Sequence, residues 1–351
     1  MATRSHTPGH LAVPESLRPT APGPALAAAA ARSRAIANGA TRVRASERTD
    51  AIVLPLSPRQ VRRSGDAIRI VDIINLSTSA NTLLRDRVLA MRSRGYDNRI
   101  LCIDGPCVPR LRAAGIPVTA VHLPRGLDPV ALVRSFVEIV TYLRRERIQL
   151  VHTHCSIPGA VGRLAARVAG VPIVMHTVHG FSFHEHSPRL ERLFYLNLER
   201  IAARVTDWLF TQNRFDFEQA ARYRLVSRDR LQWVGNGVDV DRFRPRTGER
   251  PAGQPVTITC VARMEAVKNH RLLLEAVRML RARGEAVRVL LVGDGGLRAQ
   301  LELLCAQWSI ADIVEFVGYR EDVSELLAET DIAVLTSLKE GIPRAVLEPM
   351  A

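Results

Sequence analysis

Short apolar runs rich in β-branched residues alternate with longer amphipathic stretches from residue 67 to the C-terminal residue. Runs that are apolar throughout are typical of parallel strands covered by helices on both faces, and a regular strand–helix alternation favours a doubly wound α/β sheet. The expected helices are residues 80–95, 128–148 and 188–205. The expected strands are residues 68–76, 99–104, 118–123, 150–154, 173–178, 208–212, 256–263, 287–296, 313–319 and 332–337.

A segment rich in Gly, Pro and Asp, residues 235–255, interrupts this alternation and is expected to link two domains. The predicted domains are residues 67–234 and 256–351, and a chain of 351 residues is long enough for two. Ligands of such sheets bind at the carboxyl ends of the strands. We therefore expect two Rossmann-like domains facing across a cleft, with the functional residues on the turns from strand to helix.

Residues 1–66 lack a sustained hydrophobic period and are rich in Pro, Ala and Arg. Because too little apolar surface is available there to offset the entropy of ordering the chain, this segment is predicted to be a disordered basic tail. The formal net charge of +14 suits nucleic acid, an anionic membrane or phosphorylated small molecules as partners. Aromatic residues make up only 5% of the chain, so no nucleic-acid partner is expected. A general preference for Arg explains the same charge, because Lys268 and Lys339 are the only lysines.

The five cysteines are scattered and form no Cys-x-x-Cys pair. This usage is typical of a reduced, cytoplasmic protein without a structural zinc site. No apolar run approaches the roughly 18 residues that a membrane-spanning helix needs. Two amphipathic stretches, residues 134–148 and 189–205, are candidates for contact with an anionic membrane, although packing against the core is the preferred interpretation of each.

Three strand-to-helix turns of the second domain carry candidate ligand-binding residues. Arg263 and Lys268 flank the first, where two cations beside a helix N-terminus suit a diphosphate, although most such pairs are solvated surface charges. Gly318, at the second, would let a flat ring approach backbone amides, but a plain turn explains it equally. At the third, Glu340 is expected in a loop and Glu348 on the following helix, where carboxylates accept hydrogen bonds from vicinal hydroxyls.

These turns resemble the donor half of the family-4 retaining glycosyltransferases, which have the GT-B fold. The resemblance rests on the segments VARMEAVKN, VLLVGDGGLR, VEFVGYREDV and TSLKEGIPRAVLEPMA, the last of which has the family's spacing of two glutamates. In the first domain, VHTHCSIPGAVGRLAARVAGVPIVMHTVHGFSFHE and WVGNGVDVDRF look like the family's acceptor-side motif and its interdomain segment. The resemblance extends from about residue 69 to the end of the chain.

The resemblance implies a role for each matching residue. Arg263 and Lys268 would hold the diphosphate of a nucleotide-sugar, and Glu348 would bind the ribose hydroxyls. Glu340 and His179 would be the catalytic residues, the first near the charge that develops at the anomeric carbon and the second against the donor sugar. The implied donor-binding residues are Arg263, Lys268, Gly318, Tyr319, Gly341, Ile342 and Glu348, with the backbone near Gly318 and Tyr319 reading the base.

The family resemblance therefore implies an enzyme that moves a hexose-type sugar from a UDP- or GDP-sugar to a glycan or lipid-linked acceptor, with retention, in cell-surface polysaccharide biosynthesis. It implies no metal and no cofactor, since the nucleotide-sugar is a substrate. Such an enzyme would be cytoplasmic, with peripheral contact at the inner face of the plasma membrane. The alternatives are an inactive or truncated nucleotide-sugar-binding protein and a basic nucleic-acid-binding protein. The sequence names neither the sugar, the base nor the acceptor.

Six histidines lie between residues 152 and 186. A metal site is one interpretation, but His152 and His154 are expected on opposite faces of their strand, which would make them poor joint ligands. We therefore expect no metal site. His179, at the turn before Gly180, is the preferred functional histidine, and His154 is a second candidate on the acceptor side.

The first domain departs from the family pattern after its first strand. Many members have a Gly-Gly loop there, whereas this chain has NLSTSANTLLR. A subgroup associated with exopolysaccharide and lipid-linked glycan assembly is similar in this respect. Backbone amides at the start of the following helix, near Ser79 and Asn81, would then face the cleft.

Two other motifs have structural interpretations. Asp239–Asp241 matches the metal-binding DxD of the other glycosyltransferase fold but lies in the linker, where it suits a turn. GDGGLR follows a strand like a dinucleotide fingerprint, but Arg298 replaces the third glycine. The second domain has only four expected strands, fewer than a usual doubly wound unit, so we expect the chain to end inside an incomplete domain, whereas family members continue with further strands and a final helix.

Overall fold

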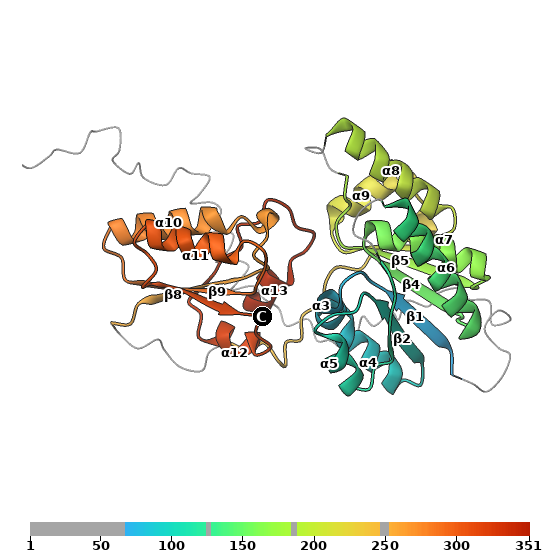
Figure 1. Ribbon diagram of the computed structural model, residues 1–351, viewed down its shortest axis with the longest axis horizontal. Helices are drawn as coiled ribbons and strands as arrows, with labels where there is room; N and C mark the ends of the chain where they lie inside the picture. The colour runs from blue at the N-terminus through green and yellow to red at the C-terminus, as the bar shows by residue number, and fades with distance from the viewer. Residues whose placement is uncertain (1–66, 124–127, 184–187, 246–252) are drawn as a thin grey trace, which may run out of the picture. The chain divides into compact units, whose positions relative to one another are not determined.

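The computed structural model describes residues 67–123, 128–183, 188–245 and 253–351. The predicted tail, residues 1–66, lies outside the described residues, as does part of the predicted linker. The described chain forms two parallel sheets, each with its own helices (Figure 1).

The first sheet has seven strands in the order β3-β2-β1-β4-β5-β6-β7, and every neighbouring pair is parallel. Reversal of the strand order beside β1 is the arrangement expected of a doubly wound sheet. The strands are β1 (Arg69–Ile73), β2 (Asp97–Cys102), β3 (Val118–Ala120), β4 (Leu150–His154), β5 (Ile173–Val178), β6 (Trp208–Thr211) and β7 (Leu231–Trp233).

Helices connect these strands and cover both faces of the sheet. They are α3 (Ser77–Ser79), the π-helical turn η2 (Ala80–Leu84), α4 (Arg85–Ser93), α5 (Val108–Ala113), α6 (Pro129–Arg145), α7 (Ser156–Ala169), α8 (Arg189–Ala203), α9 (Arg214–Arg222) and the 3₁₀ turn η3 (Arg228–Arg230). Gly170 ends α7 in the left-handed conformation, as a glycine C-cap should.

Residues of β1 and the residue that follows it belong to two different cores, because side chains alternate across an extended chain. Val71 and Ile73 pack in one core with residues of α6 and α7. Ile74, directly after β1, packs in another with residues of α4 and α5. Asp72, within the strand, is a carboxylate that is fully buried at 0% exposure.

The second sheet has four parallel strands in the order β10-β9-β8-β11. The strands are β8 (Val256–Val261), β9 (Val287–Val292), β10 (Val314–Gly318) and β11 (Ile332–Ala333). The helices are the 3₁₀ turn η4 (Ala266–Lys268), α10 (His270–Ala282), α11 (Arg298–Gln307), α12 (Val323–Ala328) and α13 (Arg344–Met350). Residues of β8, β9, α10 and α11 share one hydrophobic core.

The α/β class, the parallel pairing and most of the strands agree with the sequence prediction. Residues 150–154 and 173–178 are strands with the predicted bounds. Strand β7 was not predicted, because its three residues run directly into the Gly-rich segment. The last predicted strand, residues 332–337, is regular only over two residues.

Candidate functional site

Two loops of the second sheet lie against each other through glycines. The Ala262 amide donates to the Val292 carbonyl at 2.9 Å, and the Met264 amide donates to the Asp294 carbonyl at 3.0 Å. A side chain on Gly293 would place its Cβ 2.1 Å from the Ala262 oxygen, far inside van der Waals contact. The glycines of GDGGLR therefore allow two loops at the carboxyl ends of β8 and β9 to meet, which explains the motif without a dinucleotide.

Lys268 and Glu340 meet at the same edge of this sheet. The Lys268 Nζ lies 2.5 Å from the Glu340 Oε1, and the two side chains are 18% and 24% exposed. The chain after β11 is tied to the loop after β8, because the Leu338 amide donates to the Val267 carbonyl at 2.8 Å and the Thr336 hydroxyl donates to the Asn269 carbonyl at 3.0 Å. The structure thus brings together two residues that the family resemblance assigns to one nucleotide-sugar.

Arg263 is placed differently. Its guanidinium lies 2.5 Å from the Glu265 carboxylate, and half of its side chain is exposed. Arg263 and Lys268 therefore pair with different carboxylates, Glu265 and Glu340. A diphosphate that contacts both cations would compete with these two carboxylates.

Glu348 lies on α13, and Glu340 lies in the loop before that helix, as the sequence predicts. Gly341 and Ile342 belong to the same loop. The Arg344 Nε lies 3.0 Å from a Glu348 oxygen one helical turn away. Burial raises the pKa of Glu348, while the charges of Arg344 and Arg242 oppose that rise.

Gly318 ends β10 with a φ of +76°, a conformation that favours glycine. Its carbonyl accepts a 2.8 Å hydrogen bond from the Gly293 amide, so the loop after β10 joins those after β8 and β9. The next residue, Tyr319, has an exposed side chain. These loops bring backbone groups to the edge of the sheet where ligands of parallel sheets bind.

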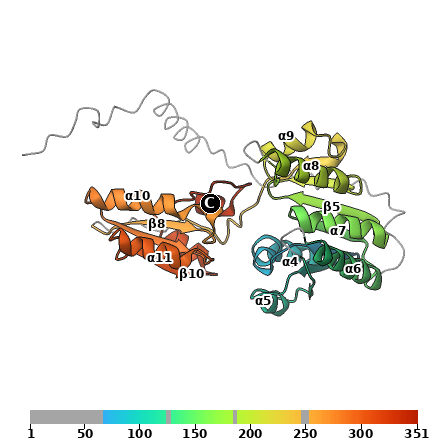
Figure 2. The same ribbon diagram turned by 45° about the horizontal axis from the view of Figure 1, so that its top comes forward.

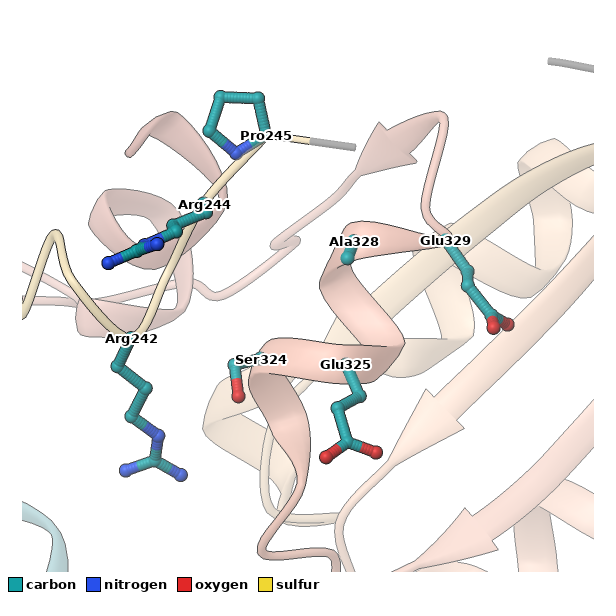
Figure 3. Close-up of a pocket in the computed structure, with 7 residues that line it drawn as sticks. All are labelled: Arg242, Arg244, Pro245, Ser324, Glu325, Ala328 and Glu329. Atoms are coloured by element: carbon teal, nitrogen blue, oxygen red, sulfur yellow. The ribbon is translucent and has the colours of Figure 1, made fainter. Parts of the chain in front are cut away.

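An open pocket lies between the linker and α12 (Figure 3). It contains none of the predicted site residues; its lining is Arg242, Arg244, Pro245, Ser324, Glu325, Ala328 and Glu329. Nearby, Asp239 accepts hydrogen bonds from the amides of Asp241 and Arg242 at 3.0 and 3.1 Å. This is the turn predicted for the DVD segment.

In the first sheet, a chain of polar contacts starts at the buried Asp72. The Nε2 of His154 lies 3.1 Å from the Asp72 Oδ1, and the Nδ1 of His154 lies 3.0 Å from the Nε2 of His179. The other ring nitrogen of His179 lies 2.9 Å from the Gln212 Oε1. Both predicted histidines are therefore neighbours, and both ring nitrogens of His179 are hydrogen-bonded within this domain.

The expectation that His152 and His154 face opposite ways is wrong. Residues two apart in a strand share a face, and the two rings lie 4.4 Å apart. Both face Asp72, whose Oδ1 lies 3.5 Å from the Nδ1 of His152. These three residues could in principle ligate a metal ion, since their ligand atoms lie within 4.8 Å of one another.

The charges around Asp72 argue against a divalent cation there. The guanidinium of Arg87 forms an ion pair with the same carboxylate oxygen that contacts His154. Burial alone would raise the pKa of Asp72, but the charge of Arg87 and the hydrogen bond with His154 outweigh burial and hold that pKa well below its usual range. A carboxylate already neutralised by Arg87 is a poor site for a second cation.

The buried histidines are neutral near pH 7. Burial lowers the pKa of His152 and of His154, although Asp72 opposes the shift. Burial, followed by the neighbouring His154, lowers the pKa of His179 to about 3. A neutral imidazole has one N–H and one lone pair, so His179 can only donate at one nitrogen and accept at the other.

The helix after β1 begins at Ser77. The Ala80 amide already donates to the Leu76 carbonyl at 2.9 Å. Ser79 is therefore the last residue whose amide is left unpaired at the start of the helix. The prediction of helix-start amides at Asn81 is therefore wrong, since Asn81 lies in the following π-helical turn. Ser79 keeps its predicted place in the first turn.

Sequence reasoning missed Asp72, Arg87 and Gln212. A detectable signal existed for one of them: Asp72 interrupts the apolar run IRIVDII, and a carboxylate inside a buried strand must find partners. Its partners come from α4 and β4, which no local pattern links to it.

Comparisons with known proteins cover both sheets. Residues 80–237 match the glycosyl transferase 4-like domain, and residues 241–351 match the glycosyl transferases group 1 family. The chain is 31% identical over 270 residues to the UDP-Gal:alpha-D-GlcNAc-diphosphoundecaprenol alpha-1,3-galactosyltransferase of Escherichia coli, over 72% of this chain and 68% of that protein. The chain belongs to the family-4 glycosyltransferases of the GT-B fold. Two further relatives of this glycosyltransferase are the Bacillus subtilis putative glycosyltransferases EpsD and EpsF, at 30% and 31% identity over 58% and 57% of this chain, and it spans 56% and 54% of their length.

Solved structures agree on the fold of this glycosyltransferase. HepE of Anabaena, in complex with UDP and glucose, has a TM-score of 0.65 at 19% identity, over 81% of this chain and 78% of that one. Sucrose-phosphate synthase of Thermosynechococcus elongatus has a TM-score of 0.64 at 18% identity, over 80% and 79%. Within the described residues, no helix combines the length and hydrophobicity that crossing a membrane requires.

Proposed function

We propose that this glycosyltransferase moves a hexose-type sugar from a UDP- or GDP-sugar to a glycan or lipid-linked acceptor, with retention, in the assembly of a cell-surface polysaccharide. The name of the Escherichia coli relative supports this choice, because that enzyme transfers galactose from UDP-Gal to a diphosphoundecaprenol-linked sugar. A lipid-linked acceptor would place the enzyme at the cytoplasmic side of an anionic membrane.

The contact between Lys268 and Glu340 carries the proposal. A cation for a diphosphate and a carboxylate for a sugar lie side by side at the edge of a parallel sheet where ligands bind. We assign Lys268 and Arg263 to the diphosphate and Glu340 to the transferring sugar. The leaving diphosphate would gain its charge beside these cations, which lowers the barrier to its departure.

The remaining roles follow the family pattern. Glu348 would accept hydrogen bonds from the ribose, and the backbone at Gly318 and Tyr319 would contact the base. Gly341 and Ile342 would line the donor sugar beside Glu340. On the acceptor side, we assign Ser79 to the helix start that faces substrate.

His179 acts in this proposal as a neutral ring that lies against the donor sugar rather than as a general acid. Its low pKa and its contacts with His154 and Gln212 leave no proton to give near neutral pH. His154 positions that ring. We propose that no metal ion takes part, and activity should then persist after treatment with EDTA.

A panel of UDP- and GDP-sugars, titrated calorimetrically and tested for hydrolysis and transfer, checks the proposal. We expect one base to bind at micromolar affinity and Glu348→Ala to weaken that binding. If the protein bound no sugar nucleotide, the donor assignment would be wrong. If the protein bound donor but transferred its sugar to neither glycan nor lipid-linked acceptors, it would be an inactive sugar-nucleotide-binding protein instead.

A further inference from the structure

Helix α8 turns its large apolar residues toward solvent. Leu190, Leu193, Phe194 and Ile201 are 83%, 53%, 40% and 50% exposed. Their spacing of three, four and eleven positions from Leu190 places them on one side of a helix with about 3.6 residues per turn. The face is therefore a continuous apolar stripe rather than a set of scattered side chains.

The opposite side of α8 buries an ion pair. An Arg163 nitrogen of α7 lies 2.8 Å from a Glu199 oxygen, and the two side chains are 0% and 2% exposed. Arg163 also donates to the Gly159 carbonyl at 3.0 Å. Glu199 follows Leu190 by nine positions, which is two and a half turns, so it faces away from the stripe.

This ion pair fixes the rotation of α8. Turning the helix to bury Leu190 and Phe194 would expose Glu199 and leave Arg163 buried without its partner, which is strongly unfavourable. Leu196, Ala202 and Ala203 pack inward beside Glu199. Helix α8 thus packs one face on the core, as the sequence analysis prefers for residues 189–205. Its large apolar residues Leu190, Leu193 and Phe194 nevertheless lie on the other face.

Arginines lie along one edge of the stripe. Arg189, Arg200 and Arg204 are exposed and, at one position before and ten and fourteen positions after Leu190, lie on its Leu193 side. None of the three has an ion-pair partner in the part of the chain that the structure describes, whereas Arg271 of α10 pairs with Glu275 and Arg298 of α11 with Glu302. Since Glu191 is the only exposed carboxylate on α8, the described surface of this helix has a net positive charge.

Helix α6 adds a second stripe on the same side of the sheet. Val130, Val133 and Val137 are exposed at the same helical spacing. Helices α6 and α8 both pack on α7, and Figures 1 and 2 show the three side by side over one face of the first sheet. Helices α6 and α8 therefore both present exposed apolar residues on the same side of the sheet.

We propose that the face made by α8 and α6 docks on an anionic lipid bilayer, with Leu190, Leu193 and Phe194 entering the interface and Arg189, Arg200 and Arg204 contacting lipid phosphates. A helix with an apolar stripe edged by arginines is the form that binds in the plane of a membrane surface. Uncompensated arginines favour a negatively charged partner, and an extended apolar stripe favours lipid over nucleic acid. The inference deepens the proposed function, because a lipid-linked acceptor lies in such a bilayer, but docking requires no catalysis.

Vesicle flotation of the full chain tests the proposal. We expect it to float with vesicles of phosphatidylcholine and phosphatidylglycerol, to float poorly with phosphatidylcholine alone, and to be released by high salt. Leu190→Ser/Leu193→Ser/Phe194→Ser and, separately, Arg189→Gln/Arg204→Gln should each lower the partition coefficient by about tenfold or more. Leu272→Ser/Met279→Ser/Leu303→Ser, which alters equally exposed residues of α10 and α11, is the control and should bind as the wild type does.

Three results would overturn the proposal. The wild-type chain could fail to float with anionic vesicles at low salt. The α8 variants could float as well as the control. Light scattering could show a dimer that the apolar α8 variant dissociates, which would assign the stripe to a second copy of the chain. Donor titration of the same proteins keeps the two ideas apart, since donor binding without flotation contradicts only the docking surface, and flotation without donor binding contradicts only the proposed function.

Discussion

The ammonium nitrogen of Lys268 lies 2.5 Å from a carboxylate oxygen of Glu340, although 72 positions separate the two residues in the chain. Parallel pairing of β11 with β8 brings them together, because strands that run the same way deliver their following loops to the same edge. In the absence of ligand each charge neutralises the other. A bound diphosphate would offer Lys268 a second anion.

Lys268→Ala should weaken binding of the donor diphosphate by about 10- to 100-fold, because a hydrogen bond to a charged group contributes about 1.5–3 kcal/mol. Glu340→Gln should instead keep donor affinity within about threefold and lower kcat, since Glu340 is assigned to the sugar in the transition state. Calorimetry and steady-state kinetics measure the two effects. Arg271→Ala, an exposed charge on α10, is the control. Unchanged UDP and GDP affinity in Lys268→Ala would remove Lys268 from the site.

The affinity for the donor should fall in mild acid, because Glu348 becomes protonated at a higher pH than an ordinary glutamate does. Burial raises its pKa above the ordinary glutamate value of about 4.3. The carboxylate form accepts hydrogen bonds from ribose hydroxyls better than the protonated form does, so affinity should fall as the pH falls through the raised pKa. Calorimetric titrations between neutral and acid pH should show this loss in the wild type and not in Glu348→Gln. An identical pH profile in both proteins would argue that Glu348 does not contact the donor.

Alanine substitutions at Gly293 and Gly296, two glycines of the same loop, should differ in their effect on stability. Gly293→Ala should unfold at a clearly lower urea concentration, by about 2 kcal/mol or more, because the new Cβ would lie 2.1 Å from the Ala262 oxygen at a φ of +137°. Gly296→Ala should be nearly neutral, since nothing lies within 4 Å of its Cβ position. Equal stability of the two variants would mean that the loops after β8 and β9 do not meet as described.

Local sequence patterns predicted the strands well and the contacts between them poorly. IVMHTV is buried at every position, so its apolar run identified β5 with the correct bounds. No local pattern joins Asp72 to Arg87 and His154, because these contacts depend on which strands become neighbours. The pairing of Lys268 with Glu340 was accessible only through the family resemblance, which assigned both to one ligand. For α8, the amphipathic pattern predicted the helix but did not say which of its residues face solvent, because the buried Arg163–Glu199 pair sets its rotation.

The buried histidines should make the fold sensitive to mild acid. Burial lowers the pKa of His152, His154, His176 and His179, so the folded protein holds fewer protons than the unfolded chain below pH 6.5. The free energy of unfolding should then fall as the pH falls below about 6.5, with a slope approaching about 1.4 kcal/mol per pH unit for each group. Urea unfolding at several pH values measures it. Constant stability between pH 7 and 5 would contradict the buried, neutral state of these rings.

The Arg163–Glu199 pair should be costly to break and easy to replace. Glu199→Ala leaves a buried guanidinium without its counter-ion, and we expect a loss of about 3–5 kcal/mol in the free energy of unfolding. Glu218→Ala, which breaks the exposed pair with Arg214, should cost less than about 0.5 kcal/mol. Arg163→Met/Glu199→Leu should recover most of the loss, because an apolar pair of similar volume avoids the desolvation of two charges. That double variant should also keep α8 in place, since Leu196 and Ala203 still pack inward. A double variant as unstable as Glu199→Ala would show that the charges themselves, and not the packing they permit, hold α8 on α7.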